Sequence, residues 1–86
     1  MSRITYYAAI PFIRTPNGEL LGLAAEKAPS RAHAELRAFN RVGALGGVDT
    51  IIGAIAFSIS GNPGTGRFVI LTRYGETPED IEDHTL

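Results

Sequence analysis

The sequence predicts an α+β domain with the element order ββαββ, in which a four-stranded antiparallel sheet carries one helix on one face. Three observations predict this fold. An Asn17-Gly18 turn separates two apolar segments, a loop over residues 61–66 separates two more, and one segment of helical periodicity lies between the two pairs. The 86 residues make one domain, and a chain of this size buries only about 60 to 65% of its unfolded surface.

The first hairpin is predicted from Asn-Gly, which is typical of a type I′ turn because both central residues need a positive φ. A two-residue turn pairs residues on one face as follows: Arg14 with Leu21, Phe12 with Leu23, and Ile10 with Ala25. On the other face it pairs Ile13 with Gly22 and Pro11 with Ala24. Proline has no N–H to donate, so Pro11 is expected at a sheet edge or a bulge.

The second hairpin is predicted around the loop of residues 61–66. Its large side chains collect on one face, through the pairs Ser60 with Arg67, Ile59 with Phe68, Phe57 with Ile70, and Ile55 with Thr72. Its smaller side chains collect on the other face, where Ala54, Ala56 and Ser58 lie opposite Arg73, Leu71 and Val69.

A helix is predicted from Arg31 to Val42. Ser30 is a suitable N-cap, and Gly43 ends the periodic segment. At 100° per residue, one apolar stripe forms from Ala32, Leu36, Phe39 and Val42. The basic residues His33, Arg37 and Arg41 recur on the opposite side, so we expect the stripe to pack on the sheet and the basic residues to face solvent.

Two strand orders fit a helix that connects two hairpins, namely 2-1-3-4 and 1-2-4-3 in chain order. In either case one helix covers one face of the sheet. The other face is expected to hold Tyr7, Ala9, Pro11, Ile13, Leu20, Ile52, Ala54, Ala56, Val69 and Leu71. Because large exposed apolar patches usually mark interfaces, we expect a homodimer formed by two-fold packing of this face, with Ile13, Leu20, Ile52, Val69 and Leu71 as its main contacts.

The charges divide the chain at residue 75. Residues 1–75 hold all eight Lys and Arg and four acidic residues, a net charge of +4, whereas residues 76–86 hold five acidic residues. The domain is therefore expected over residues 1–75, followed by an acidic C-terminal tail over residues 76–86. Two roles stay open for this tail: a solvated, frayed end, or a segment that screens the basic surface or docks on a partner.

The composition indicates a cytoplasmic protein. The chain has no cysteine, hence no disulfide framework and no thiol nucleophile. No window approaches the roughly 20 apolar residues of a membrane span, so we expect no membrane association.

Nucleotide, metal and catalytic sites are not expected. Residues 61–67 approach a phosphate-binding loop, but Arg67 and Phe68 occupy the places of its Lys and Ser/Thr, and the segment that follows has the composition of a strand. His33 has no ligand-type residue four positions away, and His84 lies in the acidic tail. No cofactor, no metal and no catalytic residue are therefore assigned, and the protein is not expected to be an enzyme.

The C-terminal half resembles a group of small uncharacterised proteobacterial proteins. The resemblance lies in Ala56-Phe57-Ser58, in a Gly-Asp/Asn-Pro loop at residues 61–63, and in an Arg-Phe/Tyr-Gly-Glu ending at residues 73–76. It departs from that group at Asn62 and Arg67. The resemblance implies an independent small domain and no particular chemistry.

The functional expectation is a small protein of unknown function that acts as a protein-interaction or self-assembling module with an unidentified protein partner. The alternative is a nucleic-acid-binding accessory protein, because the body is basic and His33, Arg37 and Arg41 line one side of the helix. Those three residues are the predicted contacts for a partner or for nucleic acid.

Overall fold

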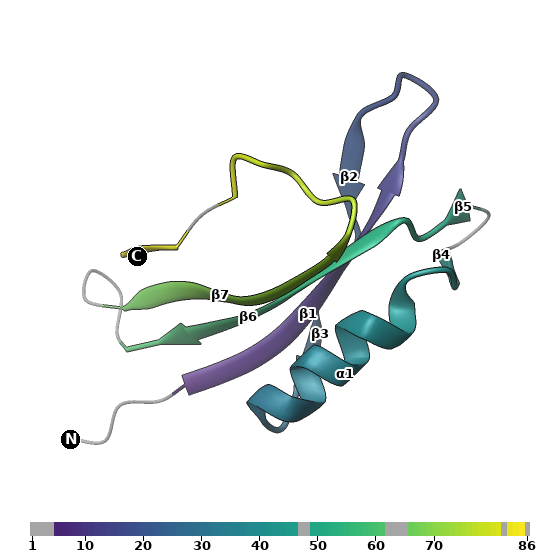
Figure 1. The fold of residues 1–86 in the computed structure, drawn as a ribbon. Helices are drawn as coiled ribbons and strands as arrows, with labels where there is room; N and C mark the ends of the chain where they lie inside the picture. The colour runs from purple at the N-terminus through teal and green to yellow at the C-terminus, as the bar shows by residue number, and fades with distance from the viewer. Residues whose placement is uncertain (1–4, 47–48, 62–65, 82, 86) are drawn as a thin grey trace.

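The computed structural model describes residues 5–46, 49–61, 66–81 and 83–85. Its elements, in chain order, are β1 (Thr5–Arg14), β2 (Leu20–Gly22), β3 (Glu26–Ala28), α1 (Arg31–Arg41), β4 (Leu45–Gly46), β5 (Asp49–Thr50), β6 (Gly53–Ser60), β7 (Arg67–Gly75) and β8 (His84–Thr85). Figure 1 shows α1 lying along one side of a long, curved sheet. The α+β class is confirmed. Within the described residues α1, with 11 residues, is the longest helix, and none there could cross a membrane.

The main sheet is antiparallel, with the order β2-β1-β6-β7-β8. β3 also pairs with β1, beyond β2, so β2 and β3 form one interrupted strand along the same edge. This is the first of the two orders that the sequence allowed. The expected number of strands was wrong, because β8 adds a fifth strand position outside β7. A separate two-stranded ribbon joins β4 to β5.

The turn of the first hairpin differs from the prediction. Gly18 has φ 85°, but no described non-glycine residue has a positive φ, and the Gly18 amide donates to the Thr15 carbonyl at 2.9 Å. This is a type I turn followed by a left-handed glycine, a three-residue connection. Pro16 explains the choice, because its fixed φ suits the second position of a type I turn.

The three-residue connection moves the register by one residue. Ile13 lies opposite Leu21 and Phe12 opposite Gly22, whereas the sequence predicted Ile13 with Gly22 and Phe12 with Leu23. The predicted register returns in β3, where Ala8 lies opposite Lys27. The irregular stretch at 23–25 absorbs the difference and splits the strand into β2 and β3.

The second hairpin confirms most of its predicted register. Ser60 pairs with Arg67, Ile59 with Phe68, Ser58 with Val69 and Phe57 with Ile70. A bulge then leaves out Leu71, so Ile55 faces Arg73 instead of Thr72. The loop residues 62–65 lie outside the described residues, but Arg67 does open a strand, as the sequence predicted.

Helix α1 packs on the sheet through its smallest side chains. Ala34 and Ala38 are fully buried against Ala9, Ala54 and Ala56, and these five alanines form one core cluster. Ser30 caps the helix as predicted, accepting from the His33 amide, and the helix ends one residue before Val42. The predicted packing stripe was wrong. The sheet presents small side chains, so the helix contacts it only if the two backbones come close together. The small side chains of Ala34 and Ala38 allow this close approach.

The two faces of the sheet are therefore exchanged relative to the prediction. The face under α1, here called the alanine face, holds Ala9, Ala54 and Ala56, with Tyr7, Leu71 and Tyr74 at its border. The opposite side, here called the large-residue face, carries Ala8, Phe12, Ile55 and Phe57, with Ile10, Ile59, Phe68 and Ile70 around them. The face expected to stay uncovered is the one that α1 covers.

The acidic tail folds back onto the sheet, which excludes a frayed end over its described residues. The Arg73 guanidinium donates to the carbonyls of Pro78, at 2.9 Å, and Ile81. Ile81 packs against the large-residue face, and the Ile70 amide donates to Asp83 Oδ1 at 2.7 Å. Figure 1 shows this segment looping back beside β7.

The tail begins where the backbone at Gly75 and Glu76 passes close to the backbone at Ile52 and Gly53. Gly75 has φ 66°, and the Glu76 amide donates to the Ile52 carbonyl at 2.9 Å. A Cβ on Gly53 would lie 1.8 Å from the Glu76 carbonyl oxygen. Only glycine at position 53 allows the chain to turn this tightly.

Candidate interaction site on helix α1

The outward side of α1 is apolar. Leu36 is 56% exposed, Phe39 61% and Val42 36%, and these three residues are called the apolar ridge below. The Phe39 ring makes an edge-to-face contact with Tyr74, with ring centroids 5.5 Å apart. The ridge is exposed because the alanines of α1, and not its larger residues, face the sheet.

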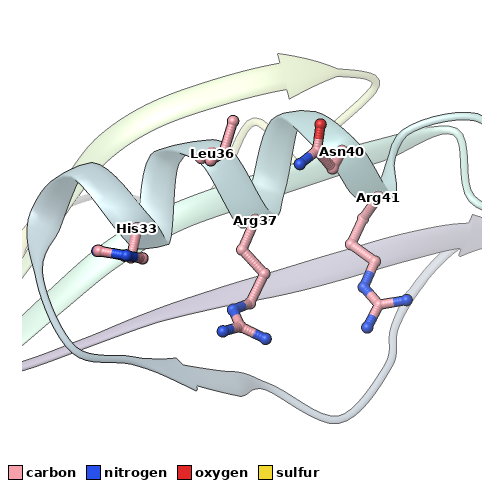
Figure 2. Close-up of a pocket in the computed structure, with 5 residues that line it drawn as sticks. All are labelled: His33, Leu36, Arg37, Asn40 and Arg41. Atoms are coloured by element: carbon pink, nitrogen blue, oxygen red, sulfur yellow. The ribbon is translucent and has the colours of Figure 1, made fainter.

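The three basic residues lie along one flank of the helix. Figure 2 shows His33, Arg37 and Arg41 pointing to the same side of α1, while Leu36 and Asn40 project from an adjacent side. We call these three residues the cation row. The sequence predicted that they line one side of the helix, and the structure brings them together there.

The cation row faces β3 and is partly neutralised. Arg41 Nη2 donates to Glu26 Oε1, and Arg37 Nη1 lies 3.9 Å from the same oxygen. The hydrogen bond and the charge of Glu26 raise the pKa of Arg41 above its ordinary value. One carboxylate thus serves two guanidinium groups, so the flank keeps an excess of positive charge. The expectation that the row points into open solvent was wrong for Arg37 and Arg41, which are half-buried.

Two polar groups on this flank differ in whether they have a hydrogen-bond partner. Arg37 Nε is buried and has no hydrogen-bond acceptor among the described residues. His33 Nδ1 lies 2.8 Å from Ser30 Oγ, at the N-cap of the helix. A buried guanidinium donor without an acceptor is costly, but a buried atom is out of reach of another molecule. Only the exposed parts of Arg37 and Arg41, whose side chains are each 41% exposed, can meet a partner.

The surface is hollowed in two adjoining places. One pocket, of about 280 Å³, is lined by His33, Leu36, Arg37, Asn40 and Arg41. The other is lined by Phe39, Asn40, Val42, Tyr74 and Gly75. Asn40 belongs to both, so they follow one another along the helix.

The predicted dimer contacts differ in their exposure and in their surroundings. Leu71 packs toward the alanine cluster beneath α1, and Ile13 is buried, with 8% exposure. Leu20 lies opposite Arg14 in β2, as a consequence of the shifted register. Ile52, before β6, and Val69, in β7, are half-buried. The register shift changes the pairing of Leu20, and α1 covers the face against which Leu71 packs.

Sequence reasoning missed Glu26 and the exposure of the ridge. The exposure of the ridge could have been predicted from Ala34 and Ala38, which are four residues apart, together with the alanines at 9, 54 and 56. Glu26 carried no such signal, because its position beside Arg41 depends on where β3 begins.

The described residues contain no group of three or more His, Cys, Asp or Glu side chains that could hold a metal ion. Comparison with protein-family models, with curated proteins and with solved structures found no match for this chain.

Proposed function

We propose that the protein is a small non-enzymatic protein-interaction module that binds an acidic, amphipathic segment of another protein through α1. The observation that carries the proposal is the apolar ridge of Leu36, Phe39 and Val42, which is exposed beside the cation row. Exposed apolar groups of this size on a small domain are typical of interaction surfaces.

The ridge defines the apolar part of the partner. Leu36, which is 56% exposed, borders the first hollow, and Phe39 borders the second. A partner helix with apolar residues three and four positions apart would place successive side chains along this line. The Phe39 contact with Tyr74 already orders one aromatic ring, which lowers the entropy lost on binding.

The flank defines the polar part of the partner. Arg37 and Arg41 share one carboxylate, and their side chains are each 41% exposed. Carboxylates of a partner would reach the exposed parts of these side chains and balance the remaining charge. An antiparallel pair of α1 helices from two copies would bring two cation rows together, so a different, acidic partner fits this site better than a second copy.

Nucleic acid is the second candidate for the cation row, and two observations favour the protein partner over it. Glu26 lies within the row and repels phosphate. The phosphate backbone also makes no use of an exposed Leu36 and Phe39, since contacts to it are electrostatic and polar. We retain nucleic acid as an outcome of the test below.

The rest of the proposal concerns assembly and setting. A cytoplasmic location is supported by a chain without cysteine. Self-association as a homodimer belongs to the proposal as well, on a surface other than α1. The resemblance to small proteobacterial proteins stays a prediction.

The test uses designed probes. One labelled peptide is an amphipathic helix with leucines along one side and glutamates along the flank, and a second has the same composition in scrambled order. The amphipathic peptide should bind saturably and at least about tenfold more tightly than the scrambled one. Leu36→Ala should weaken binding by about tenfold while leaving the thermal unfolding midpoint unchanged. Tyr6→Ala, on the opposite side of the sheet, is the matched control and should bind as the parent does.

Two results would overturn the proposal. Equal affinity for both peptides would mean that charge alone attracts them. Tight binding to a DNA duplex, with affinity falling by about one log unit per log unit of salt for each phosphate neutralised and with a smaller slope in Arg37→Ala, would favour nucleic acid.

A further inference from the structure

We infer that the outer side of β7 is a binding site for an extended, acidic segment of another protein, and that the chain's own acidic tail occupies this site until such a segment replaces it. Figure 1 shows the tail, drawn in yellow, running back beside β7. The site differs from the α1 site in its strand and in the backbone shape that it accepts. The inference therefore does not depend on the proposed function.

Arg73 holds the tail chiefly through main-chain atoms. Its guanidinium donates to the carbonyl of Pro78 at 2.9 Å and to the carbonyl of Ile81. It also donates to the Thr77 hydroxyl at 3.3 Å. Because every peptide unit carries a carbonyl, the first two bonds make no demand on the identity of the tail residues. Arg73 can therefore hold another chain that follows the same path.

Two tail side chains add selectivity. Ile81 packs against the apolar cluster of the large-residue face, and Asp83 Oδ1 accepts from the Ile70 amide at 2.7 Å. Directly after them, the backbone of β8 pairs with β7 at Arg67 and Phe68. A replacing segment therefore needs an apolar residue, a carboxylate two positions later, and then two residues of extended backbone. This is the pattern of recognition by strand addition, in which main-chain bonds bind and a few side chains select.

The charges around the site favour an acidic segment. The tail contains five acidic residues, whereas residues 1–75 have a net charge of +4. Arg67 and Arg73 are exposed on β7, and Arg14 forms an ion pair with Glu76, with 2.6 Å between Nη2 and Oε1. A partner that also carries several carboxylates keeps these attractions, and the same charges steer it toward the site.

The anchors that hold the tail lie near solvent. Arg73 and Asp83 are exposed, and Ile81 is half-buried. Segments held by few buried contacts and by exposed hydrogen bonds open locally at a low cost in free energy. β7 itself pairs with β6 from Arg67 to Gly75, so the site keeps its shape when the tail leaves it.

Competition by the tail has a measurable consequence. A peptide can bind only to the fraction of molecules in which the site is open, so its measured Kd is the intrinsic Kd divided by that fraction. A substitution that weakens the hold of the tail raises the open fraction and tightens the binding of a separate peptide. Binding at any other site would not respond in this way.

Binding of a labelled peptide with the sequence of residues 77–86 to the intact 86-residue chain tests the inference. The Ile81→Ala protein should bind this peptide about tenfold more tightly than the parent, because its own tail has lost an apolar contact. The Asp83→Ala protein should bind about fivefold more tightly, because the Ile70 amide has lost its acceptor. Glu79→Ala changes an exposed tail residue and is the matched control, with the affinity of the parent.

A second peptide shows whether order matters as well as charge. It has the same composition, scrambled so that no apolar residue lies two positions before a carboxylate, and the parent should bind it at least about tenfold more weakly. Amide NMR locates the bound peptide: the signal of Ile70 should shift, and residues 77–81 of the protein should exchange faster while β6 stays protected. Circular dichroism of each variant shows whether the fold is kept, and the comparison of the two peptides needs no variant.

Four results would overturn the inference. They are the absence of saturable binding in the parent and in both tail variants, equal affinity of the parent and those variants, equal affinity for the two peptides, and loss of binding in Leu36→Ala. The last would place the peptide on α1. Because the proposed function is tested with a helical peptide, failure of either proposal leaves the other standing.

Discussion

Replacing Ala38 by leucine tests the closest contact in the molecule, that between α1 and the alanine face. Ala38 is fully buried, and all the buried members of its cluster are alanines. Leucine adds three carbon atoms where the helix and sheet already touch. Overpacking of this kind costs about 1 to 3 kcal/mol.

That cost is large for this domain. Proteins of this size are stabilised by roughly 4 to 13 kcal/mol, and 1 kcal/mol lowers the unfolding midpoint by about 4 to 8 °C. Ala38→Leu should therefore lower the midpoint by about 4 to 24 °C. Urea unfolding followed by circular dichroism measures the same loss as a reduced midpoint concentration, with an unchanged slope.

Ala32→Leu is the matched control, since it makes the same substitution on the same helix at an exposed position. It should change the free energy of unfolding by no more than about 0.5 kcal/mol. The two variants together distinguish the two possible orientations of α1. If Ala38→Leu were harmless and Ala32→Leu destabilising, the helix would pack through Ala32, Leu36 and Phe39, and the apolar ridge would not exist.

Four further predictions concern the tail and the cation row. Gly53→Ala should destabilise the fold by about 1 to 3 kcal/mol in urea unfolding, because its Cβ would meet the Glu76 carbonyl; a neutral effect would show that the crossing is not tight. Ile81→Ala should speed hydrogen exchange and proteolysis of the tail while β6 stays protected, and uniform loss of protection would contradict a tail that opens separately. Glu26→Gln should tighten binding of the glutamate-flanked peptide by about threefold, and weaker binding would mean that Glu26 orders the row instead of neutralising it. Because the pKa of Arg41 is raised, its pairing stabilises the fold below the ordinary arginine pKa and is lost only as pH rises through the higher value, so its contribution should stay constant across neutral pH in a urea series.

The sequence predicted the elements better than it predicted their orientation. The α1 start was correct because Ser30 accepts from the His33 amide, a local interaction. The pairs from Ser60 with Arg67 to Phe57 with Ile70 were correct because β-branched and aromatic residues alternate on both strands. Such features depend on neighbours in the chain.

The errors came from features that depend on distant residues or on a competing local preference. Periodicity placed Leu36 and Phe39 against the sheet by size, but the sheet presents Ala54 and Ala56, which select the smaller side of the helix. Pro16 set the turn, and a one-residue change of register exchanges the faces of a strand.

The site was predicted only in part. The cation row was found from its four-residue spacing, whereas its partner Glu26 comes from another strand. The tail appeared solvated because of its charge, but Ile81 and the Asp83 hydrogen bond to Ile70 attach it to the sheet.

The two borders of the sheet limit how copies of the protein can join. One border consists of β2 and β3, three residues each, and the other of β8, two residues. A straight run of free backbone donors and acceptors is what allows strands to add without end. The first border is short and interrupted, whereas on the second border β8 pairs with β7 only at Arg67 and Phe68. The Ile70 amide is occupied by a side chain as well. A strand added at this border would therefore first have to displace the tail from Ile70.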